Sequence, residues 1–111
     1  LRCPDPAANP YLVLAVCLEA GLDGIRNQIT PPDAVTENVF EMQLQQRAKL
    51  GIESLPGDLE QAVEELEKDD YIKNVLGGHI TEKYLEAKRA EWADYRAQVT
   101  EWEIEKYLYK I

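Results

Sequence analysis

The apolar residues of the chain are densest near its beginning, in the segment from Tyr11 to Leu18. Asn9 is a favoured N-cap and Pro10 fits the first helical position, so the pattern predicts a helix from Pro10 to about Asn27. Because the segment is apolar on every side, we expect its side chains to be buried all round, with Cys17 filling part of the core.

The residues before this helix form an extended loop. Pro4, Pro6 and Pro10 fix their own φ angles and restrict the residues that precede them, which excludes a helix there. The loop brings Arg2 and Asp5 to the start of the first helix. A rigid polar loop in this position favours a binding or catalytic site.

An extended connector is expected over residues 29–40, because Pro31-Pro32 excludes a helix. Its apolar residues indicate that it lies along a surface; these are Val35, Val39 and Phe40. A brief helix from Gln43 to Leu50 should end at a glycine, and the chain should turn again at residues 55–57.

Capping residues mark the helices of the second half. Asp58 and Gln61 have the spacing of a capping box, and one apolar stripe follows, formed by Leu59, Ala62, Val63 and Leu66. Asp69 and Asp70 can cap a short helix from Tyr71 to Leu76, which Gly77-Gly78 would close.

The longest helix is expected to start at Thr81 and to run to about residue 98. Its apolar side is formed by Leu85, Trp92, Tyr95 and Val99. Thr100 and Glu103 are a second capping-box pair, which predicts a last helix reaching Tyr107 or beyond. The whole pattern predicts one all-α unit over residues 1–111 with an extended N-terminal loop.

Charge and composition narrow the class of protein. The formal net charge of −9 disfavours nucleic acids and anionic membranes as partners. No apolar run reaches the roughly 18 residues of a membrane-spanning helix. Cys3 and Cys17 have neither disulfide-framework density nor metal-ligand spacing, which favours a cytoplasmic protein with reduced thiols. The chain lacks an initiator Met and a signal region, so we expect it to be a piece of a longer protein.

Few residues offer chemistry. Arg2 presents a planar donor fork suited to a carboxylate or phosphate, or else it pairs with Asp5. Asp5 between two prolines favours a turn-stabilising role. His79 has no second metal-ligand partner, so a loop or capping role is favoured. The acidic run 64–70 lacks the alternating ligands and the glycine of a calcium loop. No phosphate-binding loop or catalytic triad is present.

Several motifs occur in an order typical of one enzyme family. They are Arg2-x-Pro4-Asp5-x-x-x-Asn9-Pro10-Tyr11-Leu12, Ala20-Gly21-Leu22-Asp23-Gly24-Ile25, Pro31-Pro32, Leu55-Pro56-Gly57-x-Leu59 and Trp92. Together they closely resemble the C-terminal region of type I glutamine synthetases over essentially the whole chain. The resemblance implies that the chain is the helical C-terminal subdomain of an α+β enzyme.

By this resemblance, the parent enzyme joins ammonia to glutamate at the expense of ATP, through a γ-glutamyl phosphate and with two Mg²⁺ or Mn²⁺ ions. Arg2 occupies the place of the arginine in the family motif Glu-x-Arg-x-Pro-Asp, which contacts the glutamate substrate or its phosphorylated form. A fixed arginine can neutralise charge on a transferring phosphoryl group. The glutamate of the motif, a metal ligand in the family, would stand two residues before Arg2, upstream of Leu1.

The resemblance also places the nucleotide site, the ammonium site and nearly all metal ligands upstream. We therefore expect the 111-residue chain alone to be inactive and to bind neither ATP nor metal. Without an upstream sheet, we expect the first helix to hide residues 11–18 inside its own bundle or in a self-associated interface.

Regulation and assembly are further implications of the resemblance. The segment Asn38-Val39-Phe40-Glu41-Met42 matches one in which some family members adenylylate a tyrosine, and Phe40 has no hydroxyl. The chain thus resembles the non-adenylylated branch, in which feedback inhibition and nitrogen-control repressors acting through the C-terminal region are known. Family members form homododecamers of two stacked hexamers, whose terminal helix would insert into the opposite ring through Trp102, Ile104, Tyr107 and Leu108.

Two other functions compete with this interpretation. The chain could be a stand-alone acidic helical module for interaction or oligomerisation, without catalysis. Its acidic run 64–70 could instead form a metal-binding helix.

Overall fold

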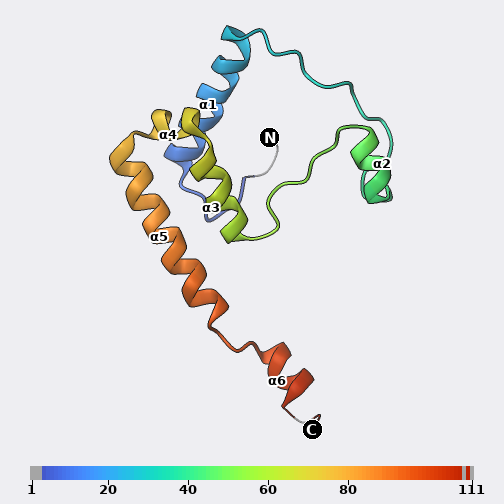
Figure 1. Cartoon of the computed structure of the whole chain (residues 1–111), viewed down its shortest axis with the longest axis vertical. Coiled ribbons are helices and arrows are strands. Elements are labelled where there is room, and N and C mark those ends of the chain that lie inside the picture. Colours follow the sequence, from blue (N-terminus) through green and yellow to red (C-terminus); the bar gives the residue numbers. More distant parts are fainter. Residues whose placement is uncertain (1–3, 109, 111) are drawn as a thin grey trace.

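The computed structural model describes residues 4–108 and 110, and within them it contains helices and no strand (Figure 1). The all-α prediction is confirmed. The helices are α1 (Pro10–Arg26), α2 (Leu44–Lys49), α3 (Leu59–Lys68), α4 (Asp70–Leu76), α5 (Gly78–Arg96) and α6 (Glu101–Tyr107). In the described part of the chain, none of these helices is long and apolar enough to cross a membrane.

Four of the helices, α1, α3, α4 and α5, pack together and form the packed part of the chain. α4 contacts α1, α3 and α5, and α5 runs along α3 (Figure 1). Tyr71 of α4 ties the packed part together, since its hydroxyl donates to the backbone oxygen of Glu19 at 3.1 Å and lies 3.2 Å from the Glu19 carboxylate. These two residues are 52 positions apart, so α1 is held by a contact between distant parts of the chain.

The core of this packed part is small. Val63 of α3 is buried with 6% of its surface exposed, and Thr81 of α5 is buried with its hydroxyl donating to the Lys73 carbonyl at 3.2 Å. The chain exposes 10004 Å², against about 6,200 Å² for a compact monomer of 12.7 kDa. Its radius of gyration of 18.4 Å likewise exceeds the roughly 13 Å of a compact domain of this length. The chain is therefore extended, with little buried apolar surface.

The other two helices stand apart. Among the described residues, α2 and α6 contact no other helix, and Figure 1 shows α2 on an arching connector and α6 beyond the end of α5. Residues around α2 form a local lobe, in which Met42 is 7% exposed and the Ile52 amide donates to the Arg47 carbonyl at 2.9 Å.

The N-caps predicted at Asn9 and Asp69 are confirmed. The Asn9 side chain accepts from the amides of Tyr11 and Leu12 at 3.0 and 3.4 Å. Asp69 accepts from the Ile72 amide at 3.0 Å and starts α4. Each of these caps satisfies amides that have no partner inside the helix.

The two capping boxes differ from each other. Thr100 and Glu103 form the reciprocal box that the sequence predicts. Asp58 accepts from the Gln61 amide at 2.8 Å, but the Gln61 side chain accepts from the Gly57 amide at 3.1 Å instead of from the cap residue. The Asp58–Gln61 box is therefore only half formed, because the Gln61 side chain reaches one residue further back.

The predicted start of the longest helix is wrong by three residues. Gly77 has a φ of 80°, a left-handed conformation that glycine adopts without strain, and it reverses the chain between α4 and α5. Helix α5 then begins at once at Gly78, and Thr81 lies buried inside it. Tyr95 and Val99, predicted on the apolar side of this helix, are 66% and 72% exposed.

The predicted burial of α1 is also wrong. Tyr11, Leu14, Leu18 and Ile25 are 81%, 69%, 64% and 75% exposed, and Cys17 is exposed and does not fill the core. The reason is that only α4, a helix of seven residues, packs on α1 and covers one side of it. Hiding residues 11–18 inside the chain's own bundle is therefore excluded.

The connector differs from the prediction as well. Val35 is 40% exposed and Phe40 is 94% exposed, so these side chains do not rest on a surface of the described chain. Only Val39 is half-buried, inside the local lobe around α2.

Candidate functional site

The opening loop is fixed by hydrogen bonds of its own. The Asp5 carboxylate accepts from the Ala7 amide at 2.7 Å, and the Asp5 carbonyl accepts from the Ala8 amide at 2.9 Å. The turn-stabilising role of Asp5 is thereby confirmed. Its carboxylate accepts a hydrogen bond from the backbone of its own turn, which favours a structural role over a catalytic one.

The end of this loop is joined rigidly to α1. Asn9 caps the helix and Pro10 occupies its first turn, so the direction in which the chain enters α1 is set. The predicted site residue Arg2 lies outside the described residues, as does Cys3. The structure thus positions residues 4–9 of the candidate site.

A groove lies beside the loop. It has a cavity volume of about 390 Å³ and combines Pro4, Asp5 and Asn9 with apolar residues of four helices. The apolar lining includes Leu12, Val16, Leu66, Ile72, Leu76 and Tyr84. Among the described residues, no cationic side chain lines the groove, and most of the lining is apolar.

Sequence reasoning missed this groove. Its far wall comes from α3, α4 and α5, more than fifty residues beyond the loop. Leu66 was recognised as part of an apolar stripe, but no local signal relates it to Asn9. The packing of α4 against both α1 and α3, which includes the hydrogen bond from Tyr71 to Glu19, brings the two together.

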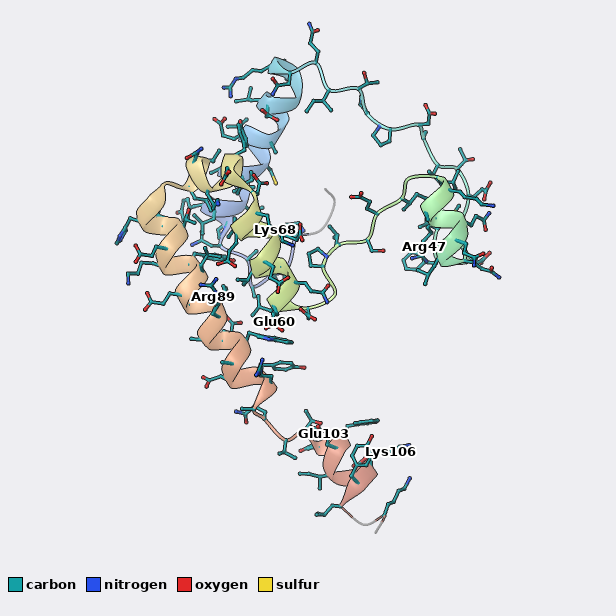
Figure 2. All side chains as sticks on the ribbon, viewed as in Figure 1. Arg47, Glu60, Lys68, Arg89, Glu103 and Lys106 are labelled. Atoms are coloured by element: carbon teal, nitrogen blue, oxygen red, sulfur yellow. The ribbon has the colours of Figure 1, made fainter. Side chains whose placement is uncertain are left out.

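A second groove lies between α3 and α5 and is polar. It has a volume of about 410 Å³ and is lined by charged side chains on both helices. Arg89 of α5 forms an ion pair with Glu67 of α3. Figure 2 shows Arg89 on α5 and Glu60 on the neighbouring helix α3. The indole N–H of Trp92 is buried without a hydrogen-bond partner among the described residues. The mixture of paired charges is typical of a solvated helix interface.

The remaining candidates show no metal site. Within residues 4–108 and 110, no three His, Cys, Asp or Glu side chains converge as metal ligands would, and this holds for the acidic run 64–70. His79 is exposed in the first turn of α5, whose N-cap is Gly77 without a side-chain cap, so the predicted loop or capping role is wrong. The structure has no fitting ligand set for Mg²⁺ or Mn²⁺ in this part of the chain.

The titratable groups reflect helix geometry. The Lys73 ammonium, 2.7 Å from the Asp70 carboxylate, lowers the pKa of Asp70. The backbone amide of Thr100 donates to Glu103 at 2.8 Å and lowers the pKa of that carboxyl. Partial burial raises the pKa of Tyr71, and its hydrogen bond to Glu19 adds to the effect. None of these shifts marks a catalytic acid or base, because each belongs to a helix end or a helix contact.

The four predicted tail anchors lie along α6 and at its C-cap. Trp102, Ile104, Tyr107 and Leu108 are 60%, 41%, 62% and 59% exposed. The rings of Trp102 and Tyr107 meet edge to face, with centroids 5.9 Å apart. Their exposure leaves a small apolar surface with no partner in the described chain.

Comparison with known proteins gives a consistent match. Residues 1–107 match the family model for the glutamine synthetase catalytic domain. The chain is 53% identical to the glutamine synthetase of Thermotoga maritima, over 97% of this chain and 25% of that protein. It is 51% identical to the enzyme of Methanocaldococcus jannaschii, over 96% and 24%, and 50% identical to that of Clostridium saccharobutylicum, over 99% and 25%. The chain thus spans about a quarter of the length of these relatives.

Proposed function

The chain belongs to the glutamine synthetase family, and we propose that it is the C-terminal part of a type I glutamine synthetase of the non-adenylylated branch. The longer protein would join ammonia to glutamate at the expense of ATP. The observation that carries this proposal is the identity of about one half over nearly the whole chain, to bacterial and archaeal glutamine synthetases alike.

We assign to Arg2 the role of contacting the glutamate substrate or its phosphorylated form. Support comes from the next residues of the motif, since the turn at Asp5 and the cap at Asn9 fix the loop that follows Arg2. A guanidinium held on a rigid loop can neutralise negative charge without reorganising during the reaction.

The nucleotide and the metal ions are assigned to the part of the longer protein that this chain does not span. The described residues contain no set of metal ligands, and the groove beside the loop is apolar. Bound ATP with its metal ions would supply the phosphoryl group that activates glutamate. The 111-residue chain alone is accordingly proposed to be inactive.

The assignment of Arg2 is tested in the longer protein by the variant Arg2→Lys. The variant keeps the charge but loses the planar donor fork, so kcat/KM for glutamate should fall about a hundredfold. Arg96→Lys is the matched control, since Arg96 is an exposed arginine at the end of α5 and should leave the rate unchanged. Equal values of kcat/KM for the wild type and Arg2→Lys would contradict the assignment of Arg2 to the substrate site.

The exposed tail supports a role in assembly. We propose that Trp102, Ile104, Tyr107 and Leu108 anchor α6 on a subunit of the opposite ring in a homododecamer. Their exposure in a helix that contacts no other described helix supports this, because buried aromatic anchors are typical of interfaces. Deletion from Trp102 onward should release single rings in sedimentation experiments, and intact dodecamers would contradict the assignment.

Regulation and location follow the same family assignment. Phe40 is almost fully exposed at the segment that some family members adenylylate, and it has no hydroxyl to modify. Feedback inhibition and a nitrogen-control repressor that contacts the C-terminal region are therefore proposed instead, in the cytoplasm.

The competing function is a stand-alone helical module without catalysis. The coding sequence upstream of Leu1 distinguishes the two proposals. If the chain is part of a glutamine synthetase, that sequence should encode the rest of the family sequence.

A further inference from the structure

Tyr71 of α4 makes a directional contact with α1. Its hydroxyl donates to the backbone oxygen of Glu19 at 3.1 Å and lies 3.2 Å from the carboxylate of the same residue. Among the described residues, no other side-chain hydrogen bond or ion pair joins α1 to another helix. A hydrogen bond weakens steeply when its geometry changes, whereas apolar contacts are non-directional. The Tyr71 hydroxyl therefore fixes the position of α1 along α4 more sharply than apolar packing does.

Tyr71 stands on a helix that is itself anchored on two sides. The Lys73 ammonium donates to the Glu67 carbonyl of α3 at 2.6 Å, and the Lys73 carbonyl accepts from the Thr81 hydroxyl of α5 at 3.2 Å. Helix α4 thus lies where α1, α3 and α5 meet (Figure 1). The Tyr71 hydroxyl places α1 against a fixed support.

The first half of α1 can carry this placement to the start of the helix. Between Pro10 and Glu19 the sequence contains no glycine and, after Pro10 itself, no proline. Sharp bends in helices occur at such residues, so this half should move as one unit. A shift of the helix along its axis at Glu19 then displaces Pro10 by the same amount.

The opening loop continues the connection beyond Pro10. Asn9 caps α1 with its side chain, and the Asp5 carboxylate accepts from the Ala7 amide at 2.7 Å. These local hydrogen bonds join the loop to the helix start. Arg2 stands only two residues before Pro4 in the sequence, so a shift of α1 is passed through the loop toward Arg2.

We propose that Tyr71 is a positioning residue for Arg2, because its hydroxyl fixes α1 on α4 and so holds the loop that carries the guanidinium to the substrate. This role depends on the one proposed for Arg2. A misplacement of about 1 Å caused far from the reacting atoms can reduce a rate about a hundredfold. Loss of the Tyr71 hydroxyl leaves the packing of α4 on α1 in place, so we expect a smaller effect.

The test is a double-mutant cycle of Tyr71→Phe and Arg2→Lys in the longer protein. Tyr71→Phe removes the hydroxyl and keeps the ring, and it should lower kcat/KM for glutamate about fivefold. In the Arg2→Lys background the same change should lower kcat/KM less than about twofold, because the group to be positioned has already lost its planar donor fork.

The matched control is Tyr95→Phe. It removes the hydroxyl of a tyrosine that is 66% exposed on α5, and it should leave kcat/KM unchanged. Circular dichroism and sedimentation of Tyr71→Phe should show the helix content and the assembly of the wild type.

A wild-type kcat/KM in Tyr71→Phe would overturn the positioning role, since other contacts of the longer protein would then hold α1. An equal loss in both backgrounds would overturn it too, because a purely structural role lowers the amount of active protein in the same proportion whichever residue stands at position 2. A normal kcat/KM in Arg2→Lys would refute the role of Arg2 and the positioning role with it. A loss in Arg2→Lys without one in Tyr71→Phe would contradict the positioning role alone.

Discussion

Helices α3 and α6 start with nearly the same chemistry but end in different environments. Asp58 caps α3 and Thr100 caps α6, each accepting from the amide three residues later. Yet α3 buries Val63 against its neighbours, whereas Trp102 of α6 remains 60% exposed. The comparison shows that capping residues determine where a helix begins, while packing requires an apolar surface opposite it.

The two helices should therefore differ in how much they contribute to the stability of the whole chain. A seven-residue helix such as α6 is far below the roughly 12–15 residues that an isolated helix needs, so its capping box supports it almost alone. Helix α3 is supported by the packed part. Substitutions in the two regions can separate local from global effects.

The largest effect is expected for Val63→Ala. This change removes two buried methyl groups from the small core and should lower the free energy of unfolding by about 2 kcal/mol, a large share of the stability of so open a chain. Urea unfolding followed by circular dichroism measures it. Leu44→Ala, at a residue 79% exposed on α2, is the matched control and should change stability by less than about 0.5 kcal/mol.

An intermediate effect is expected from removing the two caps. Asp58→Ala and Thr100→Ala should each cost the helix they start about 1 kcal/mol. Because α6 contacts no other described helix, only Asp58→Ala should shift the global unfolding midpoint, and Thr100→Ala should increase fraying at residues 101–107 as seen by NMR. If both variants shift the midpoint equally, the proposed independence of α6 is wrong.

The smallest effect concerns the pH dependence of α6. The pKa of Glu103 is lowered from its ordinary 4.5 by the Thr100 amide, so its contribution to the helix is present above that value and is lost as the pH falls through the lowered pKa. Chemical shifts of residues 101–107 should report fraying in this acidic range. In Glu103→Gln, an amide that can accept the same hydrogen bond but does not titrate, the pH dependence due to this residue should disappear.

Local features were predictable because their causes lie within a few residues. The caps at Asn9, Asp69 and Thr100 each depend on a side chain and an amide two or three positions away. The same holds for the turn at Asp5, whose carboxylate reaches the amide of Ala7. These signals sufficed to place the opening loop at the start of α1.

The burial of side chains was less predictable, because it depends on which other segments of the protein pack against a helix. The apolar composition of residues 11–18 indicated a buried helix, but only α4 covers it in this chain. The start of α5 was misplaced since Thr81, a good N-cap by type, bonds instead to the Lys73 carbonyl of the preceding helix. The groove beside Asn9 likewise needs walls from α3, α4 and α5, which no spacing in the sequence relates to the loop.

The long separation between Glu19 and Tyr71 has a consequence for the order of assembly. Helices α3, α4 and α5 follow one another closely and can associate with little loss of loop entropy, whereas docking of α1 must close a loop of 52 residues. The folding barrier for α1 should thus be crossed after the three-helix unit has formed. Amides of α1 should exchange with solvent through partial openings that leave α3 and α5 protected, making α1 the last helix to join the packed part and the first to leave it.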